Sequence, residues 1–119
     1  MRVPILQQGG YLIASVQSSL SDEELLQLRD DLVARVSTVR ARGVVIDVTV
    51  LDVMDSFATR ILRDIAQMIK LRGAPTVVVG IQPEVALAMV QLGLSLGNLE
   101  TALDLEEGLT LLGEHTKAD

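Results

Sequence analysis

The sequence contains no cysteine and no tryptophan, and it has only one phenylalanine, one tyrosine and one histidine among its 119 residues. Without cysteine there is no disulfide framework and no zinc site built on thiolates, which fits a reducing compartment. Hydrophobic residues nevertheless make up 49% of the chain. The core must therefore be built from leucine, valine, isoleucine, alanine and methionine, and the aliphatic surplus leaves room for an apolar surface that contacts other subunits.

The chain also lacks the segments that would direct it to a membrane or out of the cell. Its start, MRVPILQQGG, has one arginine and no apolar stretch of the kind found in secretory signals. The uncharged run Val85–Leu99 is shorter than the roughly 20 residues that a membrane span needs. The net charge of -6 disfavours binding to nucleic acid, which depends on neutralising phosphates. We expect a cytoplasmic protein with neither a membrane nor a nucleic acid as a partner.

The signatures of common enzymes are absent as well. There is no Gly-x-Ser-x-Gly nucleophile elbow, no phosphate-binding P-loop and no dinucleotide fingerprint. The single histidine, His115, is near the end of the chain, where a solvated residue is the simpler interpretation. A nucleotide-binding or hydrolytic enzyme therefore has no motif in its favour, and we expect a protein without catalytic activity or cofactor.

The hydrophobic pattern predicts one α/β domain over residues 1–119. Two apolar runs separated by Gln7–Gly10 predict a hairpin, and strands and helices then alternate along the chain. This order predicts a mostly parallel sheet with one antiparallel strand near the N-terminus, covered by helices. The expected strands are 3–6, 11–16, 44–48, 76–80 and 100–102; the expected helices are 21–42, 56–71, 84–92 and 104–112, with residues 115–119 frayed.

The two long predicted helices have recognisable ends and apolar stripes. Ser21 with Glu24 forms a capping-box pattern at the start of the first, and Gly43 is expected to end it. The second begins after Asp55, and Gly73 is expected to close it. Its buried stripe is expected to consist of Phe57, Ile61, Ile65 and Met68.

Three acidic residues, Asp47, Asp52 and Asp55, follow the predicted buried strand 44–48. The carboxyl end of such a strand is where open α/β sheets bind ligands, so a metal site is one interpretation. The structural alternative, which we favour, is that Asp55 caps the next helix while Asp47 and Asp52 accept hydrogen bonds from loop amides or face water. We expect no bound metal.

Ser56 is the more informative residue because it follows Asp55 at the first position of a helix. Its hydroxyl should point outwards, and a phosphate there would meet free amides and the positive end of the helix dipole. The nearby Asp52 and Asp55 would add to its negative charge and repel a docked partner. Position alone also fits a small polar residue that is simply tolerated at a helix start. Thr59, one turn later, is a weaker second candidate for phosphorylation.

Three segments together resemble the STAS family, the domains of sulfate transporters and anti-sigma-factor antagonists. They are VVIDVTVLDVMDSFATRILRDI, GAPTVVVGIQPEVALAMVQLGL and ETALDLEEGL, and the resemblance extends over nearly the whole chain. It implies a mixed, mostly parallel five-stranded sheet with about four helices. It also implies that the phosphoacceptor lies in the Asp-Ser element, here Asp55 and Ser56, with Asp52, Asp55 and Ser56 at the partner-binding surface.

Within this family the chain most resembles the short, single-domain scaffold proteins of the bacterial stressosome. The resemblance implies co-assembly with longer RsbR-like STAS paralogues, and with further copies of itself, into a large hollow complex. Such complexes sequester a switch serine kinase, release it when the STAS serine is phosphorylated, and are reset by a PP2C-type phosphatase. We expect sensing to belong to a paralogue, because no sensor domain precedes the STAS unit in this sequence.

One departure from a neighbouring branch of the family affects the functional prediction. Anti-sigma-factor antagonists usually read D-S-S-G-L at this element, whereas this chain reads D-S-F-A-T. The difference favours the stressosome scaffold. An antagonist that binds an anti-sigma kinase in a small complex stays open as the alternative.

Overall fold

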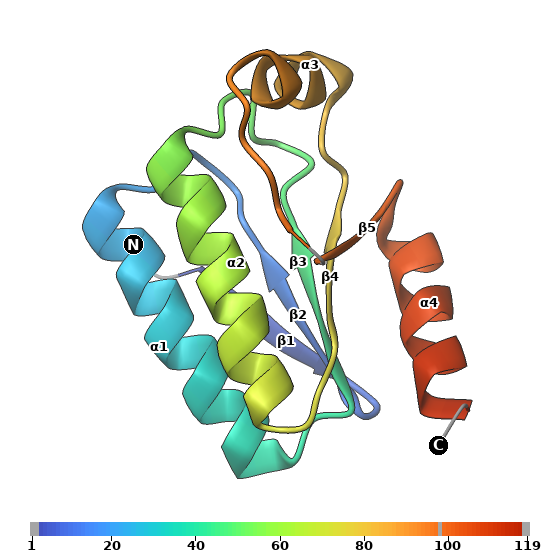
Figure 1. Ribbon diagram of the computed structural model, residues 1–119. Helices are drawn as coiled ribbons and strands as arrows, with labels where there is room; N and C mark the ends of the chain where they lie inside the picture. The colour runs from blue at the N-terminus through green and yellow to red at the C-terminus, as the bar shows by residue number, and fades with distance from the viewer. Residues whose placement is uncertain (1–2, 98, 118–119) are drawn as a thin grey trace.

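The sheet begins with an N-terminal hairpin and is then extended by parallel strands (Figure 1). The computed structural model describes residues 3–97 and 99–117, and over these ranges the strands are hydrogen-bonded in their chain order. β1 is antiparallel to β2, with Gln8 opposite Tyr11, and each later strand is parallel to the one before it. The strands are β1 (Ile5–Gln8), β2 (Tyr11–Ser15), β3 (Gly43–Asp47), β4 (Thr76–Val79) and β5 (Glu100–Ala102).

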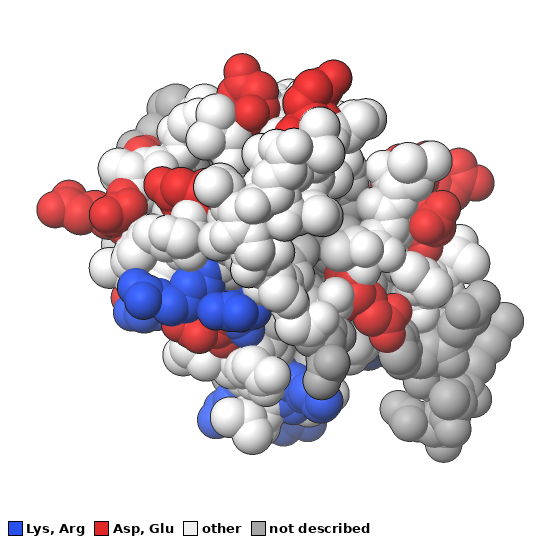
Figure 2. All heavy atoms as spheres, turned by 45° about the horizontal axis from the view of Figure 1, so that its top comes forward, with Lys and Arg blue, Asp and Glu red and all other residues white. Residues whose placement is uncertain are grey.

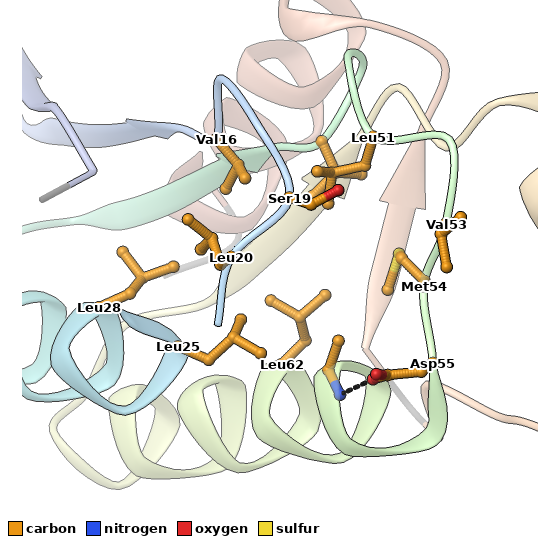
Figure 3. A pocket seen from close by; sticks show the side chains of 12 residues that line it. Val16, Ser19, Leu20, Leu25, Leu28, Leu51, Val53, Met54, Asp55 and Leu62 are labelled. Carbon is orange, nitrogen blue, oxygen red and sulfur yellow. Dashed lines mark hydrogen bonds between the residues drawn. The ribbon is translucent and has the colours of Figure 1, made fainter. Parts of the chain in front are cut away.

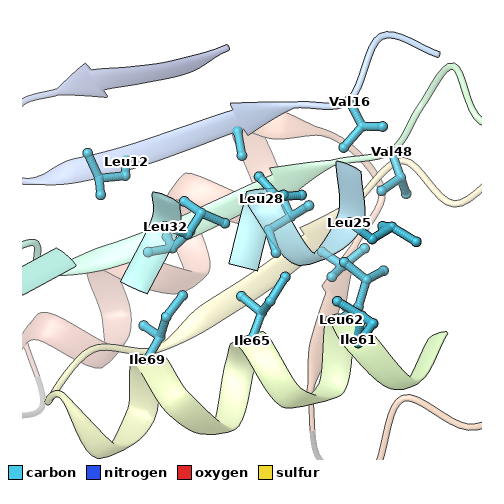
Figure 4. Close-up of a cluster of buried hydrophobic side chains, with 14 of the residues drawn as sticks. Leu12, Val16, Leu25, Leu28, Leu32, Val48, Ile61, Leu62, Ile65 and Ile69 are labelled. Atoms are coloured by element: carbon cyan, nitrogen blue, oxygen red, sulfur yellow. The ribbon is translucent and has the colours of Figure 1, made fainter. Parts of the chain in front are cut away.

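Helices cover both faces of this sheet (Figure 1). They are α1 (Asp22–Val39), α2 (Ser56–Leu71), α3 (Pro83–Gln91) and α4 (Leu105–Lys117). Strand residues alternate between the faces, so Ile46 and Val78 pack on the side of α1 and α2, while Val45 and Val77 pack on the side of α4. Figure 4 shows the larger cluster, in which aliphatic side chains of α1 and α2 meet those of β2 and β3. The predicted fold class, an α/β fold with five strands in a mostly parallel sheet and four helices, is confirmed.

The start of α1 has the predicted capping box. The Ser21 hydroxyl accepts a hydrogen bond from the Glu24 amide at 3.1 Å, and the Glu24 carboxylate accepts one from the Ser21 amide at 2.9 Å. The second bond is the main cause that lowers the pKa of Glu24 from 4.5 to about 2. Local sequence alone therefore determines where this helix begins.

Two predicted helix ends were wrong. α1 stops at Val39 rather than near Arg42, because Arg40 adopts a left-handed backbone with φ 52° and the Arg42 amide donates to the Gly10 carbonyl, in the turn between β1 and β2, at 2.7 Å. α4 continues through His115 to Lys117, so the predicted fraying of 115–117 was also wrong. Each residue added to an existing helix gains a backbone hydrogen bond, which favours extension. Residues 118–119 lie outside the described ranges.

The buried stripe of α2 differs from the predicted one. Met68 is exposed and Phe57 is only half-buried, whereas Leu62 and Ile69 are buried beside Ile61 and Ile65. The helix packs against both α1 and β4, so its buried face is wider than a single stripe and is rotated towards α1. Over the described part of the chain, no helix combines the length and the apolar character that crossing a membrane requires.

Candidate functional site

The candidate site lies where the loop after β3 enters α2, at the carboxyl end of the parallel strands. Asp55 is the N-cap of α2, and its carboxylate accepts a hydrogen bond from the Ala58 amide at 2.8 Å. Ser56 follows as the first helical residue and is exposed. Within the described ranges no hydrogen bond engages the Ser56 hydroxyl. The local sequence Asp-Ser thus places a free hydroxyl at the positive end of a helix of 16 residues.

The loop that carries this site is held at its base by polar contacts. The Asp47 carboxylate accepts from the Thr49 amide at 3.0 Å and from the Thr49 hydroxyl at 2.6 Å. The Gln82 side chain, just before α3, donates to the Thr49 carbonyl at 2.7 Å. The loop is therefore tied both to the end of β3 and to the segment that follows β4.

These contacts support the structural interpretation of the acidic residues. Asp55 caps the helix and Asp47 satisfies a loop amide, as the structural interpretation predicted, and Asp52 is exposed. Across residues 3–97 and 99–117, no group of three or more acidic or histidine side chains is arranged to hold a metal ion. The acidic residues are best understood as helix-capping and loop-stabilising groups with an exposed negative charge beside them.

Thr59, the second candidate for phosphorylation, has a different environment from Ser56. It is only 2% exposed, and its hydroxyl donates to the Asp55 carbonyl at 2.9 Å. An enzyme could reach this hydroxyl only after the first turn of α2 opened. The burial of Thr59 weighs against it and leaves Ser56 as the accessible hydroxyl of the pair.

A surface hollow beside Ser56 contains two cations that the sequence analysis did not assign to the site. It is bordered by Ser56, Phe57, Arg60 and Arg63 of α2 and by the segment 93–95. The Arg60 guanidinium lies 5.4 Å from the centre of the Phe57 ring, a cation–π distance. The sequence spacing could have predicted the position of Arg60, because Arg60 follows Ser56 by four residues and so lies on the same helix face. In Figure 2 the basic side chains gather towards the lower left, and acidic groups lie mainly above and to the sides.

A small apolar pocket lies on the other side of the Asp55 backbone, between the loop and α1 (Figure 3). Its volume is about 100 Å³, well below the range of roughly 300 to 1,000 Å³ typical of ligand sites. Val53 lines this pocket and is 67% exposed. The pocket suits an aliphatic side chain far better than a nucleotide. Its lining residues are Val16, Ser19, Leu20, Leu25, Leu28, Val48, Leu51, Val53, Met54, Asp55, Ala58 and Leu62.

A profile of the STAS domain family matches residues 2–108, which is most of the chain. The chain belongs to the STAS domain family. Among solved structures, this STAS domain is 35% identical to an RsbS of Moorella thermoacetica in which a serine is replaced by glutamate, with a TM-score of 0.84 over 98% of this chain and 99% of that one. It is 34% identical to a chain in the structure of the stressosome, described as a signal integration and transduction hub, with a TM-score of 0.76 over 96% and 99% of the two chains.

Two further proteins are similar to this STAS domain at lower sequence identity. A curated relative, the RsbT co-antagonist protein RsbRA of Bacillus subtilis, is 28% identical over 114 residues, which is 96% of this chain but only 41% of RsbRA. The anti-sigma-factor antagonist SpoIIAA is 10% identical with a TM-score of 0.68, so it shares the fold. The family assignment and the RsbS-like stressosome resemblance predicted from the sequence are confirmed.

The cap at Asp55 gives a direct test of how the site is built. Replacing Asp55 with alanine removes the acceptor for the Ala58 amide and is expected to lower the free energy of unfolding by about 1 kcal/mol. In a domain of this size that corresponds to a fall in Tm of about 4 °C. Asp55→Asn, which keeps an acceptor oxygen but removes the charge, should retain most of the stability. Thermal denaturation of both variants measures the difference, and equal losses would mean that the charge rather than the cap stabilises α2.

Proposed function

We propose that this STAS domain is a non-enzymatic scaffold and regulatory protein of a stressosome, and that it sequesters a switch serine kinase until Ser56 is phosphorylated. The observation that carries the proposal is the exposed, unengaged Ser56 hydroxyl at the head of α2. Identities of 34% and 35% over nearly the full length to a stressosome chain and to an RsbS support it. The kinase would control a general stress response or a related signalling pathway.

Phosphorylation at Ser56 would change the charge of this surface rather than its fold. A phosphate adds about two negative charges beside the exposed Asp52 and the N-cap Asp55. Arg60 and Arg63 border the same hollow and would offset part of that charge. The acidic side of the site, towards the loop, would become the repellent part, and a kinase docked across Asp52, Asp55 and Ser56 would be released.

Exposed aliphatic side chains in the loop before Ser56 and at α3 supply apolar area for a partner. Val50 and Val53 in the loop are 56% and 67% exposed, and Val90 on α3 is 77% exposed. Leu87 and Leu92 at α3 are also exposed. Contiguous exposed apolar patches mark protein–protein interaction sites, and we propose that these residues contribute to one.

The remaining partners follow from the same proposal. An RsbR-like STAS paralogue and further copies of this chain would form the assembly, and a PP2C-type phosphatase would reset Ser56. The curated relative RsbRA, by its name a co-antagonist of RsbT, supports a partnership of this kind. All these partners act in the cytoplasm, where we place this protein as well.

The proposal is tested by incubating the protein with its cognate kinase and ATP and mapping the product by mass spectrometry. We expect a single phosphate on Ser56 and none on Thr59, because the Thr59 hydroxyl is buried. The Ser56→Ala variant should incorporate almost no phosphate, since Thr59, the other hydroxyl in the first turn of α2, is buried. Phosphate on Ser56→Ala at the wild-type level would refute the assignment.

The second candidate function is an anti-sigma-factor antagonist in a small complex, supported by the shared fold of SpoIIAA. Size-exclusion chromatography of the protein mixed with the RsbR-like paralogue separates the two candidates. The scaffold is expected to elute in a large particle with the paralogue. Elution of the two proteins at their separate positions would favour the antagonist.

A further inference from the structure

The C-terminal end of α2 presents an exposed leucine among cations. Leu71, the last residue of the helix, is 85% exposed, the largest fraction among the large apolar side chains that the structure describes. Arg40 and Arg72 border the same surface hollow as Leu71, and Lys70 directly precedes it. The Arg72 side chain is fixed by a hydrogen bond of 3.0 Å that its Nε donates to the Ser37 hydroxyl. We call this group, Arg40 with residues 70–72, the basic leucine end.

The apolar pocket shown in Figure 3 lies beside the N-cap Asp55, at the opposite end of the same helix. Ala58 and Leu62, in the first half of α2, contribute to its wall. An α-helix rises about 1.5 Å per residue, so about 20 Å separates Ala58 from Leu71 along α2. Leu71 therefore cannot reach the pocket of its own chain, and a side chain that fills this pocket has to come from another molecule.

The pocket matches one leucine side chain in size and chemistry. Its volume is about 100 Å³, and apart from Ser19 and Asp55 its wall is apolar. An apolar cavity of about 150 Å³ accommodates benzene, with six carbons, so about 100 Å³ corresponds to the four carbons of a leucine side chain. Ser19 and Val53 are exposed, and Leu20 and Leu51 are half-buried. The apolar wall can therefore be reached from solvent.

The charge around this pocket is opposite to that of the basic leucine end. The pocket is bordered by residues from the segments 16–25 and 48–58, which contain no lysine or arginine. The positive ends of the α1 and α2 dipoles offset only about half a unit charge each, so most of the negative charge of these segments remains. Their five carboxylates belong to Asp22, Glu23, Glu24, Asp52 and Asp55.

We propose that the basic leucine end of one copy of this chain docks on the apolar pocket of a second copy. Leu71 enters the pocket, and Arg40, Lys70 and Arg72 face the carboxylates around it. The two surfaces differ, so the contact is heterologous: a copy that is bound at its pocket still presents its own Leu71, and association continues until a ring closes. The inference rests on the proposed function only in that copies of this chain meet in the assembly, and the contact itself involves neither the kinase nor phosphorylation.

The test is sedimentation equilibrium of the purified chain alone, from about 10 μM to about 1 mM, because one inserted side chain with a few ion pairs makes a small and weak interface. The mean mass of the wild type should rise with concentration, and high salt should reduce the rise because exposed ion pairs are screened. Ala58→Leu fills the pocket with a side chain of its own chain, and Leu71→Ser removes the inserted group. Each variant should weaken self-association by about tenfold or more.

Two matched controls separate this contact from general stickiness. Ala66→Leu makes the same change at another half-buried alanine of α2, which lies outside the pocket. Leu103→Ser makes the same change at a leucine that is also highly exposed, just after β5. Both controls should associate as the wild type does. Thermal denaturation of Ala58→Leu and Leu71→Ser should give Tm values no lower than those of the controls, so that a loss of association is not a loss of folding.

An equimolar mixture of Ala58→Leu and Leu71→Ser completes the test. Ala58→Leu keeps its Leu71 and Leu71→Ser keeps an open pocket, so the mixture should form a one-to-one dimer and grow no further. Two variants that stay monomeric when mixed, a wild type that is monomeric up to about 1 mM, or an equal loss in Ala66→Leu or Leu103→Ser would overturn the proposal. Because no kinase is present, such a failure leaves the assignment of Ser56 intact, and a failure of that assignment leaves this contact intact.

Discussion

The Ser56→Asp variant is expected to bind the switch kinase at least tenfold more weakly than the wild-type protein. The substitution places a fixed negative charge beside Asp52 and the N-cap Asp55, on a surface where the wild type has an uncharged hydroxyl. A like charge brought against a docked acidic group costs several kcal/mol when water is excluded, and tenfold in affinity is only about 1.4 kcal/mol. Aspartate carries about half the charge of a phosphate, so full phosphorylation should weaken binding further.

The dissociation constant, measured by calorimetry against the purified kinase, checks this prediction. Ser56→Ala should bind as tightly as the wild type, because it removes the hydroxyl without adding charge. Ser37→Asp is the matched control, since Ser37 is exposed on α1 and its hydroxyl accepts a hydrogen bond from Arg72 in a region away from the loop. If Ser56→Asp bound the kinase with unchanged affinity, the repulsion mechanism would be wrong.

The charge-repulsion mechanism also predicts how the kinase affinity of Ser56→Asp responds to salt and to replacement of Arg60. Arg60 lies one turn after Ser56 and borders the same hollow, so it screens part of the introduced charge. The loss of affinity in Ser56→Asp should therefore become larger when Arg60 is also replaced by glutamine. It should become smaller in high salt, because exposed charges are screened over about 10 Å at 0.1 M ionic strength. If neither the Arg60 replacement nor high salt altered the loss of affinity in Ser56→Asp, the cause of that loss would be steric.

Local signals in the sequence were enough to predict most of the fold. The capping box of Ser21 and Glu24 and the N-cap Asp55 mark helix starts through contacts within four residues, so no distant part of the chain is needed to predict them. The buried strands β3 and β4 also follow from local composition. The N-terminal hairpin was predicted as well, but its first strand was expected at residues 3–6 and lies at Ile5–Gln8, so Gln7 and Gln8 belong to the strand rather than to the turn. The family resemblance then favoured Ser56 as the predicted phosphoacceptor, which position alone had left undecided.

The features that the sequence did not reveal all depend on packing between distant segments. α2 buries Ile69 rather than Met68 because it contacts α1 and the sheet at once, and helical periodicity alone does not fix the rotation of a helix. The burial of Thr59 and of Thr76 likewise results from contacts that only the folded chain provides. The clearest example is the Thr76 hydroxyl, which has no hydrogen-bond partner among the described residues. A threonine within a strand of β-branched residues does not reveal from sequence that its hydroxyl will be buried and unpaired.

The loop that presents Ser56 depends on a close approach between two backbones at its base. Gly80, directly after β4, has φ +83°, a conformation that residues with a side chain rarely adopt. A Cβ atom added there would lie 2.9 Å from Cβ and 3.0 Å from Cα of Thr49, and it would overlap the Thr49 hydroxyl. Thr49 cannot yield easily, because its hydroxyl and amide donate to Asp47 while its carbonyl accepts from Gln82.

Gly80→Ala is therefore expected to lower the free energy of unfolding by about 2 to 5 kcal/mol, the sum of the backbone strain and the overpacking. Gly93→Ala is the matched control: its φ is +71°, but nothing lies within 4 Å of the added Cβ, so it should lose only about 1 to 2 kcal/mol. Urea denaturation measures both values, and equal losses would mean that Thr49 moves aside without cost. Because Thr49 begins the loop that ends at Asp55, Gly80→Ala should also slow phosphorylation of the protein that remains folded, whereas Gly93→Ala should leave Thr49 and the base of that loop unchanged.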